Sequence, residues 1–183
     1  MSTVAIVGAG PLGRWLAMSA ARAGFRVRLE DVMPANLHHA REALRQELSA
    51  EAMPAVAFVS TLEDAVRDAD LVIDCVPDEL ESKLEIFCLL DRMAPPRTVL
   101  ATPTTRLSIA DLAACTYRAD RCIAIVAEAS AIPARFTEPG AELLLHTTPE
   151  TAPEAIALLQ AFWERVGFTP RFEPEPSATP PRQ

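Results

Sequence analysis

Three glycines near the start of the chain have a spacing that suits contact with phosphate groups. Gly8, Gly10 and Gly13 follow the pattern G-x-G-x-x-G, and Pro11 and Leu12 complete the segment. In such a turn the first glycine allows the bend, the second lets a pyrophosphate approach the backbone, and the third allows close helix packing. The helix that follows offers backbone amide donors to the same anion. These residues therefore predict a dinucleotide-binding turn.

An acidic residue further along indicates which dinucleotide is preferred. Asp31 lies at the end of a predicted second strand, 18 residues after Gly13. A carboxylate there accepts hydrogen bonds from both ribose hydroxyl groups of NAD, and it repels the 2′-phosphate of NADP. We therefore expect NAD(H) as the cofactor, with FAD as the remaining alternative.

The glycine pattern indicates dinucleotide binding only where it follows a strand and begins a helix. The segments on its two sides predict such a strand and such a helix. An apolar run over residues 3–8 predicts a strand, and helical spacing over 11–23 stops at Gly24. Further strands are predicted over residues 27–31, 55–59, 71–76, 98–101, 122–126, 141–145 and 169–172, and helices over 35–49, 61–68, 78–93, 108–114 and 153–166. This alternation predicts an α/β fold in a single domain: a doubly wound, mostly parallel Rossmann sheet with a strand pair added after residue 140.

Composition and charge narrow the classes of function. The 183 residues include 25 acidic and 17 basic side chains, which gives a net charge of −8, and only 5% are aromatic. Such a chain offers no basic surface for nucleic acid. No apolar run reaches the ~18 residues of a membrane span, and the N-terminus does not resemble a signal peptide. We expect a cytoplasmic protein that binds a small molecule, without nucleic-acid or membrane binding.

The cysteines and the C-terminal prolines give two further expectations. Cys75, Cys88, Cys115 and Cys122 show no CxxC pairing, so we expect reduced core thiols and no metal site. Five prolines fall within the last 14 residues. We therefore expect residues 1–173 to form the folded domain and residues 174–183 to form a disordered tail that is dispensable for folding.

Several segments, from about residue 3 to about residue 172, resemble the NAD-binding domain of 3-hydroxyacyl-CoA dehydrogenases. Residues 4–14 (VAIVGAGPLGR) are similar to the first strand–helix unit of that family, and residues 70–83 (DLVIDCVPDELESK) are similar to its D-L-V-I-E-A-V-P-E-D-L-x-x-K segment. The resemblance implies that the second segment lines the dinucleotide through Val76, Pro77, Asp78 and Lys83. Residues 100–109 (LATPTTRLSI) resemble L-A-S-N-T-S-S-L-S-I, which places Thr105 at a substrate-facing serine and Pro103 at an asparagine.

The resemblance fails at the catalytic base. The family segment R-x-I-G-x-H-F-F-N-P carries a histidine that removes the proton of the 3-hydroxyl group while hydride moves to NAD. The corresponding residues 121–130 (RCIAIVAEAS) place Val126 at the histidine and Ala129 at the asparagine. The glutamate that fixes the histidine tautomer corresponds to Glu138 by ungapped counting, or to Leu144 by alignment through residues 151–154. Either way, the acid–base dyad of the family is broken.

Two other residues are candidates to replace the base. Glu128 comes two positions after Val126, so an extended strand end would point both side chains the same way and place a carboxylate near the nicotinamide. An exposed loop carboxylate is the alternative interpretation of Glu128. His146 matches no catalytic position of the family and is interpreted as a packing residue at a strand end.

Two functional hypotheses follow. The first is an NAD-dependent oxidoreductase with an atypical site, in which Thr105 and Glu128 are the candidate catalytic residues. By resemblance, its substrate is a 3-hydroxy or 3-keto acyl thioester such as an acyl-CoA, or a related hydroxy acid. The second is a non-catalytic NAD-binding module. Because the helical second domain of the family would follow this chain, we expect a homodimer or a partner that supplies that domain.

Overall fold

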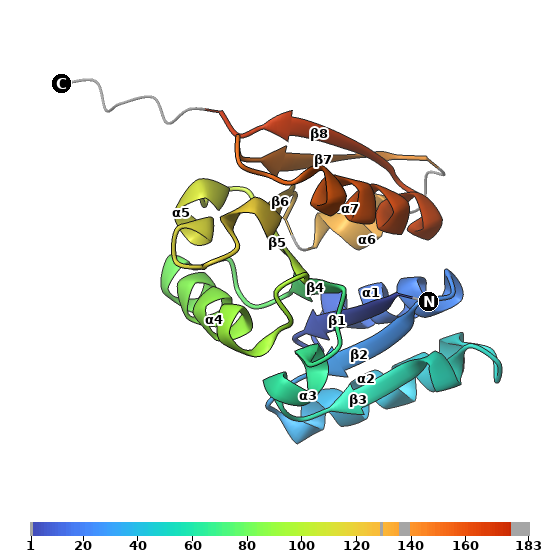
Figure 1. Cartoon of the computed structure of the whole chain (residues 1–183). Helices are drawn as coiled ribbons and strands as arrows, with labels where there is room; N and C mark the ends of the chain where they lie inside the picture. Colours follow the sequence, from blue (N-terminus) through green and yellow to red (C-terminus); the bar gives the residue numbers. More distant parts are fainter. Residues whose placement is uncertain (1, 129, 136–139, 177–183) are drawn as a thin grey trace.

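The computed structural model describes residues 2–128, 130–135 and 140–176, and it contains one eight-stranded sheet (Figure 1). The strands are β1 (Thr3–Val7), β2 (Arg26–Glu30), β3 (Val56–Val59), β4 (Leu71–Asp74), β5 (Val99–Thr104), β6 (Cys122–Val126), β7 (Glu142–Thr147) and β8 (Thr169–Pro174). Their order is β3-β2-β1-β4-β5-β6-β7-β8. Strands β1 to β6 are parallel, β7 is antiparallel to β6, and β8 is parallel to β7. The predicted Rossmann sheet, with its added strand pair, is confirmed.

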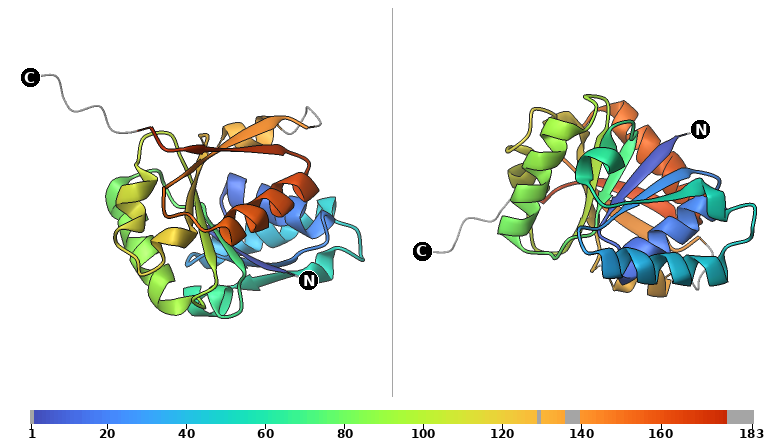
Figure 2. Two further views of the ribbon diagram at one scale, coloured as in Figure 1. Left: turned by 45° about the horizontal axis from the view of Figure 1, so that its top comes forward. Right: turned by 90° about the horizontal axis from the view of Figure 1, so that it is seen from below.

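Helices cover both faces of the sheet (Figure 2). They are α1 (Pro11–Arg22), α2 (Pro34–Glu47), α3 (Leu62–Val66), α4 (Leu80–Met93), α5 (Ile109–Ala113), α6 (Ala131–Arg135) and α7 (Pro153–Val166), with short 3-10 turns at Met53–Ala55 and Ala119–Arg121. Along β1, Val4 and Ile6 pack toward α1, α2, α6 and α7, whereas Ala5 and Val7 pack toward α3, α4 and α5. Burial on both sides explains why the central strands are apolar without alternation.

The helix and strand ends agree with local sequence signals. Ser108 begins α5, and its hydroxyl accepts a hydrogen bond from the amide of Asp111 at 3.2 Å. Helix α7 ends at Gly167, whose φ of 107° lies in the left-handed region that favours glycine. The last strand, predicted to end at residue 172, continues to Pro174.

The chain keeps its structure beyond residue 173, which differs from the expectation of a tail beginning at Pro174. Pro174 pairs with Thr147, and the amide of Glu175 donates to the carbonyl oxygen of Thr147 at 2.9 Å. The Glu175 carboxylate accepts from the Ser108 hydroxyl at 2.9 Å and from two amides at the start of α5. These residues are ordered because a negative charge satisfies helix N-terminal donors. Residues 177–183 of the expected tail lie outside the described residues.

Candidate functional site

The glycine turn places its glycines in three different environments. Gly8 has a φ of 103° and donates its amide to the carbonyl oxygen of Glu30 at 2.8 Å. A Cβ atom on Gly13 would lie 1.8 Å from the carbonyl oxygen of Gly8, so only glycine lets α1 pack against the turn. A Cβ atom on Gly10 would meet no heavy atom within 4 Å. The open space beside Gly10, at the N-terminus of α1, fits an approaching pyrophosphate.

Asp31 is buried beside this turn and holds it in shape. Its Oδ2 atom accepts from the amide of Ala9 at 2.9 Å, and its Oδ1 atom accepts from the amide of Met33 at 2.8 Å. The side chain of Asn36 donates to both oxygens, at 3.2 and 3.0 Å. Because Asn36 is exposed, its side chain can give way to a ribose diol without disturbing the backbone contacts. No local sequence pattern predicts this contact of Asn36.

A second acidic residue lies at the end of β2. Glu30 is buried next to Asp31, and burial, followed by the charge of Asp31, raises its pKa to about 7. A 2′-phosphate placed here would face the Asp31 carboxylate. The arrangement therefore favours NAD over NADP, as predicted.

The only lysine of the chain is buried and faces a carboxylate. Lys83 donates its Nζ atom to Oδ2 of Asp74 at 2.9 Å and to the carbonyl oxygen of Val76 at 3.1 Å. Asp74 also accepts from the Thr102 hydroxyl at 2.9 Å and from the Val76 amide at 2.8 Å. Burial raises the pKa of Asp74, and the positive charge of Lys83 acts in the opposite direction. In this structure Lys83 therefore holds the loop that carries Val76, Pro77 and Asp78.

Asp78 joins this loop to the loop that follows β5. The Oδ2 atom of Asp78 accepts from the amide of Thr105 at 3.3 Å, and its carbonyl oxygen accepts from Nη2 of Arg106 at 2.6 Å. Among the described residues, the buried Oδ1 atom of Asp78 has no hydrogen-bond partner. An unpaired buried acceptor is costly, and a ligand hydroxyl can reach only the part of the Asp78 side chain that is exposed. This geometry fits the expectation that Asp78 contacts the dinucleotide.

A cavity of about 690 Å³ lies next to the Asp78 contacts, between the loop after β5 and strands β6 and β7. Thr105 and Arg106 form part of its wall, and so do Val126, His146 and Glu175. The cavity is also lined by four residues that carry hydroxyl groups: Thr104, Ser108, Thr147 and Thr148. The cavity is therefore lined by apolar and hydroxyl groups together with charged side chains, and it adjoins the Asp78 loop through Thr105 and Arg106.

Among the described residues, the positions expected for the catalytic histidine and its glutamate partner carry no titratable side chain. Strand pairing joins Ala124 to His146 and Ile125 to Leu145, so the next step of the register brings Leu144 opposite Val126. Glu128 is exposed, and it is not among the described residues that line the cavity. His146 does line it, which the sequence interpretation as a packing residue missed. Ala129 and Glu138 lie outside the described residues.

The described residues were also compared with what a metal site and a membrane span require. No group of three or more histidine, cysteine, aspartate or glutamate side chains among them could hold a metal ion. In the same part of the chain, no helix is both long enough and apolar enough to cross a membrane.

Comparison with known proteins decides the family. Residues 3–170 match the model of the 3-hydroxyacyl-CoA dehydrogenase, NAD binding domain. The chain belongs to this family. Its cofactor assignment, NAD, is thereby confirmed, and so is the resemblance seen in the sequence.

Relatives of the family match this chain over part of their own length. A probable 3-hydroxybutyryl-CoA dehydrogenase of Bacillus subtilis is 35% identical over 133 residues, which are 66% of this chain and 46% of that protein. The lambda-crystallin homolog of Bos taurus is 33% identical over 181 residues, which are 91% of this chain and 54% of that protein. The chain thus spans about half the length of these relatives.

A solved structure supports the fold and the family together. A diketoreductase described as catalysing reactions of dicarbonyl compounds superposes with a TM-score of 0.80 at 26% identity, covering 99% of this chain and 67% of that one. The family's nucleotide-binding half is therefore present here with all three turn glycines and the acidic residue at the end of β2.

Proposed function

We propose that this chain binds NAD(H) as part of an oxidoreductase that acts on a 3-hydroxy or 3-keto acyl thioester, such as an acyl-CoA, or on a related hydroxy acid. One observation carries the proposal: Asp78 contacts Thr105 and Arg106, and both of these line the cavity. A dinucleotide held along the Asp78 loop would therefore end beside a space able to take a small substrate.

Each part of the site has a role in this proposal. The amides at the N-terminus of α1 bind the pyrophosphate, Asp31 binds the adenosine ribose, and the Asp78 carboxylate accepts from a second ribose hydroxyl. Thr105 lines the cavity, and its hydroxyl group would donate to a substrate oxygen. NAD supplies the hydride acceptor, or NADH the hydride donor. Glu128 remains a candidate base, to be tested against His146.

The second candidate is a non-catalytic NAD-binding module. It is favoured by Val126, which stands opposite Leu144 where a proton-transferring pair would be needed. In that case a homodimer partner, or a protein carrying the helical domain of the family, would complete the site. Light scattering of the purified protein at several concentrations tests the homodimer.

Calorimetric titration distinguishes cofactor binding from its absence. We expect NADH to bind more tightly than NADPH, and Asp31→Asn, which keeps an oxygen acceptor but removes the charge, to weaken NADH binding while affecting NADPH less. Equal affinities of the unmodified protein for the two cofactors would contradict the NAD assignment of this site. Following NADH absorbance with acetoacetyl-CoA then separates the two candidates, since a module that binds NADH without turnover is the second one.

A further inference from the structure

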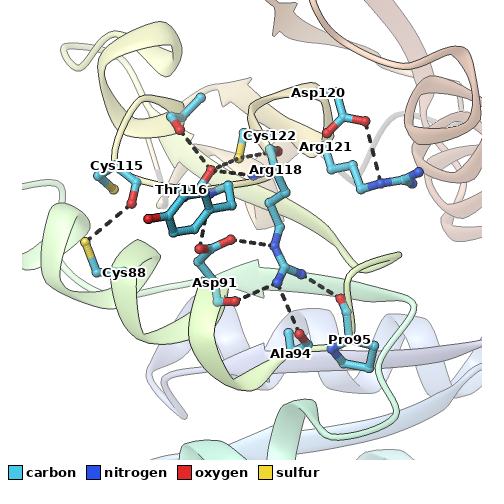
Figure 3. A network of polar contacts seen from close by, with 12 residues as sticks. Cys88, Asp91, Ala94, Pro95, Cys115, Thr116, Arg118, Asp120, Arg121 and Cys122 are labelled. Carbon is cyan, nitrogen blue, oxygen red and sulfur yellow. Dashed lines mark hydrogen bonds and ion pairs between the residues drawn. The ribbon is translucent and has the colours of Figure 1, made fainter.

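A buried arginine fixes the segment after α5 against the end of α4 (Figure 3). The Nε atom of Arg118 donates to Oδ1 of Asp91 at 2.8 Å, and its Nη1 atom donates to the carbonyl oxygen of Pro95 at 2.6 Å. Its Nη2 atom donates to the carbonyl oxygens of Asp91 and Ala94, at 2.7 and 3.1 Å. Asp91 also accepts from the amide of Tyr117 at 3.1 Å. The backbone of residues 115–118 is thus held in one position relative to α4.

This arrangement brings Cys88, on α4, close to Cys115, in the segment after α5. The Sγ atom of Cys88, on α4, donates to the carbonyl oxygen of Cys115 at 3.7 Å (Figure 3). The Sγ atom of Cys115 lies 3.9 Å from the carbonyl oxygen of Leu84, one turn before Cys88 on the same helix. Burial raises the pKa of Cys115 to about 11, and a hydrogen bond with the Cys88 side chain adds to this effect. Each sulfur atom therefore lies beside the backbone of the element that carries the other thiol.

The two thiols differ in their access to solvent. Cys88 is exposed and Cys115 is half-buried, so the expectation that every cysteine is a core thiol is wrong for Cys88. Cys122 is buried and its pKa is raised by burial to about 12. Burial also raises the pKa of Cys75. An oxidant in solution would therefore meet Cys88 first.

We propose that Cys88 and Cys115 form a reversible disulfide that ties α4 to the segment after α5. With glutathione disulfide as the oxidant, the Cys88 thiolate attacks one sulfur atom, forms a mixed disulfide and releases one glutathione thiolate. The Cys115 thiolate then attacks Sγ of Cys88 and releases the second glutathione. Two protein thiols lose two protons and two electrons, and one glutathione disulfide becomes two glutathione molecules.

The fixed backbone favours the second step over reaction of Cys88 with another protein. The cysteines are 27 residues apart in sequence, but Arg118 holds the segment whose Cys115 carbonyl oxygen lies 3.7 Å from Sγ of Cys88, so the local concentration of Cys115 at Cys88 is high. Closing a loop of this length restricts the unfolded chain, and the oxidised protein should melt several degrees higher than the reduced protein. Neither thiol lines the cavity, so this proposal is independent of the proposed function.

Peptide mapping tests the bond directly. Trypsin releases each cysteine in its own peptide: residues 68–83, 84–92, 107–118 and 122–135 contain Cys75, Cys88, Cys115 and Cys122. The full-length protein is incubated with glutathione disulfide and quenched with acid, its free thiols are blocked with N-ethylmaleimide in guanidinium chloride near neutral pH, and it is digested without reductant. We expect peptides 84–92 and 107–118 joined with the loss of two hydrogens, while the other two peptides carry the blocking group. Dithiothreitol should separate the joined pair.

Two serine variants distinguish this mechanism from other thiol reactions. Cys115→Ser should stop at glutathione on Cys88, and Cys88→Ser should leave Cys115 unmodified. Serine at position 115 retains a donor for the carbonyl oxygen of Leu112, which Cys115 contacts at 3.0 Å, so this variant should fold. Stable glutathione on Cys88 in the unmodified protein, a bond between Cys115 and Cys122, or no reaction at all would each overturn the proposal.

Discussion

The Nζ atom of Lys83 lies 2.9 Å from Oδ2 of Asp74, and both side chains are almost fully buried. The pair stands beneath the loop that begins with Val76, whose amide and carbonyl oxygen both take part in its hydrogen bonds. Removing two charges from water is costly, so the pair is stable only with these added partners. Its integrity therefore determines the shape of one wall of the cofactor site.

Replacing the lysine should be strongly destabilising. Lys83→Met leaves the Asp74 carboxylate buried and uncompensated, which typically costs about 3–5 kcal/mol. Urea unfolding at pH 7 measures the change, and the double variant Lys83→Met, Asp74→Asn should recover part of it. A loss below about 1 kcal/mol in Lys83→Met would show that the pair is not a structural one.

The second and third glycines of the turn, Gly10 and Gly13, should respond differently to substitution. Gly10→Val places its side chain in open space, so its melting temperature should match the unmodified protein while NADH binding is lost. Gly13→Ala forces a carbon against the carbonyl oxygen of Gly8, and should cost about 3 kcal/mol of stability. Thermal melting and calorimetry on both variants check this. Retained NADH affinity in Gly10→Val would place the pyrophosphate elsewhere.

Stability should fall as Glu30 loses its proton. Because the folded state raises the pKa of Glu30 from 4.5 to about 7, the folded protein binds this proton more tightly than the unfolded chain does. The contribution is fully present below pH 4.5 and is lost as pH rises through 7, by about 1–3 kcal/mol. Unfolding free energies between pH 5 and 8 should therefore decline less in Glu30→Gln. The exposed-site variant Glu85→Gln is the control, and parallel profiles for Glu30→Gln and the unmodified protein would refute the assignment.

The ordered part of the C-terminal segment should contribute to folding. A chain ending at residue 173 loses the Glu175 contacts with Ser108 and α5, which should cost about 1–3 kcal/mol. A chain ending at residue 176 retains them and should melt like the full-length protein. The two shortened chains distinguish the contribution of Glu175 to stability from that of the residues after 176. Equal melting temperatures of the two chains would show that the Glu175 contacts do not stabilise the fold.

Turnover should be low, because Val126 cannot accept a proton. A positioned base typically contributes about 10²–10⁴-fold, so the protein should reduce acetoacetyl-CoA far more slowly than an intact member of the family. Val126→His alone should gain little, since Leu144 opposite it cannot fix a histidine tautomer. Rates of Glu128→Gln and His146→Gln locate any residual base. Efficient turnover that is lost in Glu128→Gln would make Glu128 the base instead.

The features that the sequence predicts correctly are those determined by residues close together in the sequence. The glycine turn, the apolar strands and the end of α7 at Gly167 all depend on local conformation or on short-range periodicity, so spacing alone predicts them. The missed features join distant segments: Glu175 caps a helix 66 residues earlier in the sequence, and Lys83 turns inward to a strand. The contact of Cys88 with Cys115 is of the same kind. Such contacts depend on how packed elements meet, which no local pattern records.

The contrast between Gly10 and Gly13 bears on how this chain could change over generations. Selection for a folded protein alone would remove substitutions at Gly13, because its neighbour leaves no room for a side chain. The same selection would be indifferent to Gly10, where a side chain meets nothing. A lineage that gave up its nucleotide would drift at Gly10 first and keep Gly13. Among diverged copies of this domain, Gly10 is therefore the position whose loss marks the loss of the ligand.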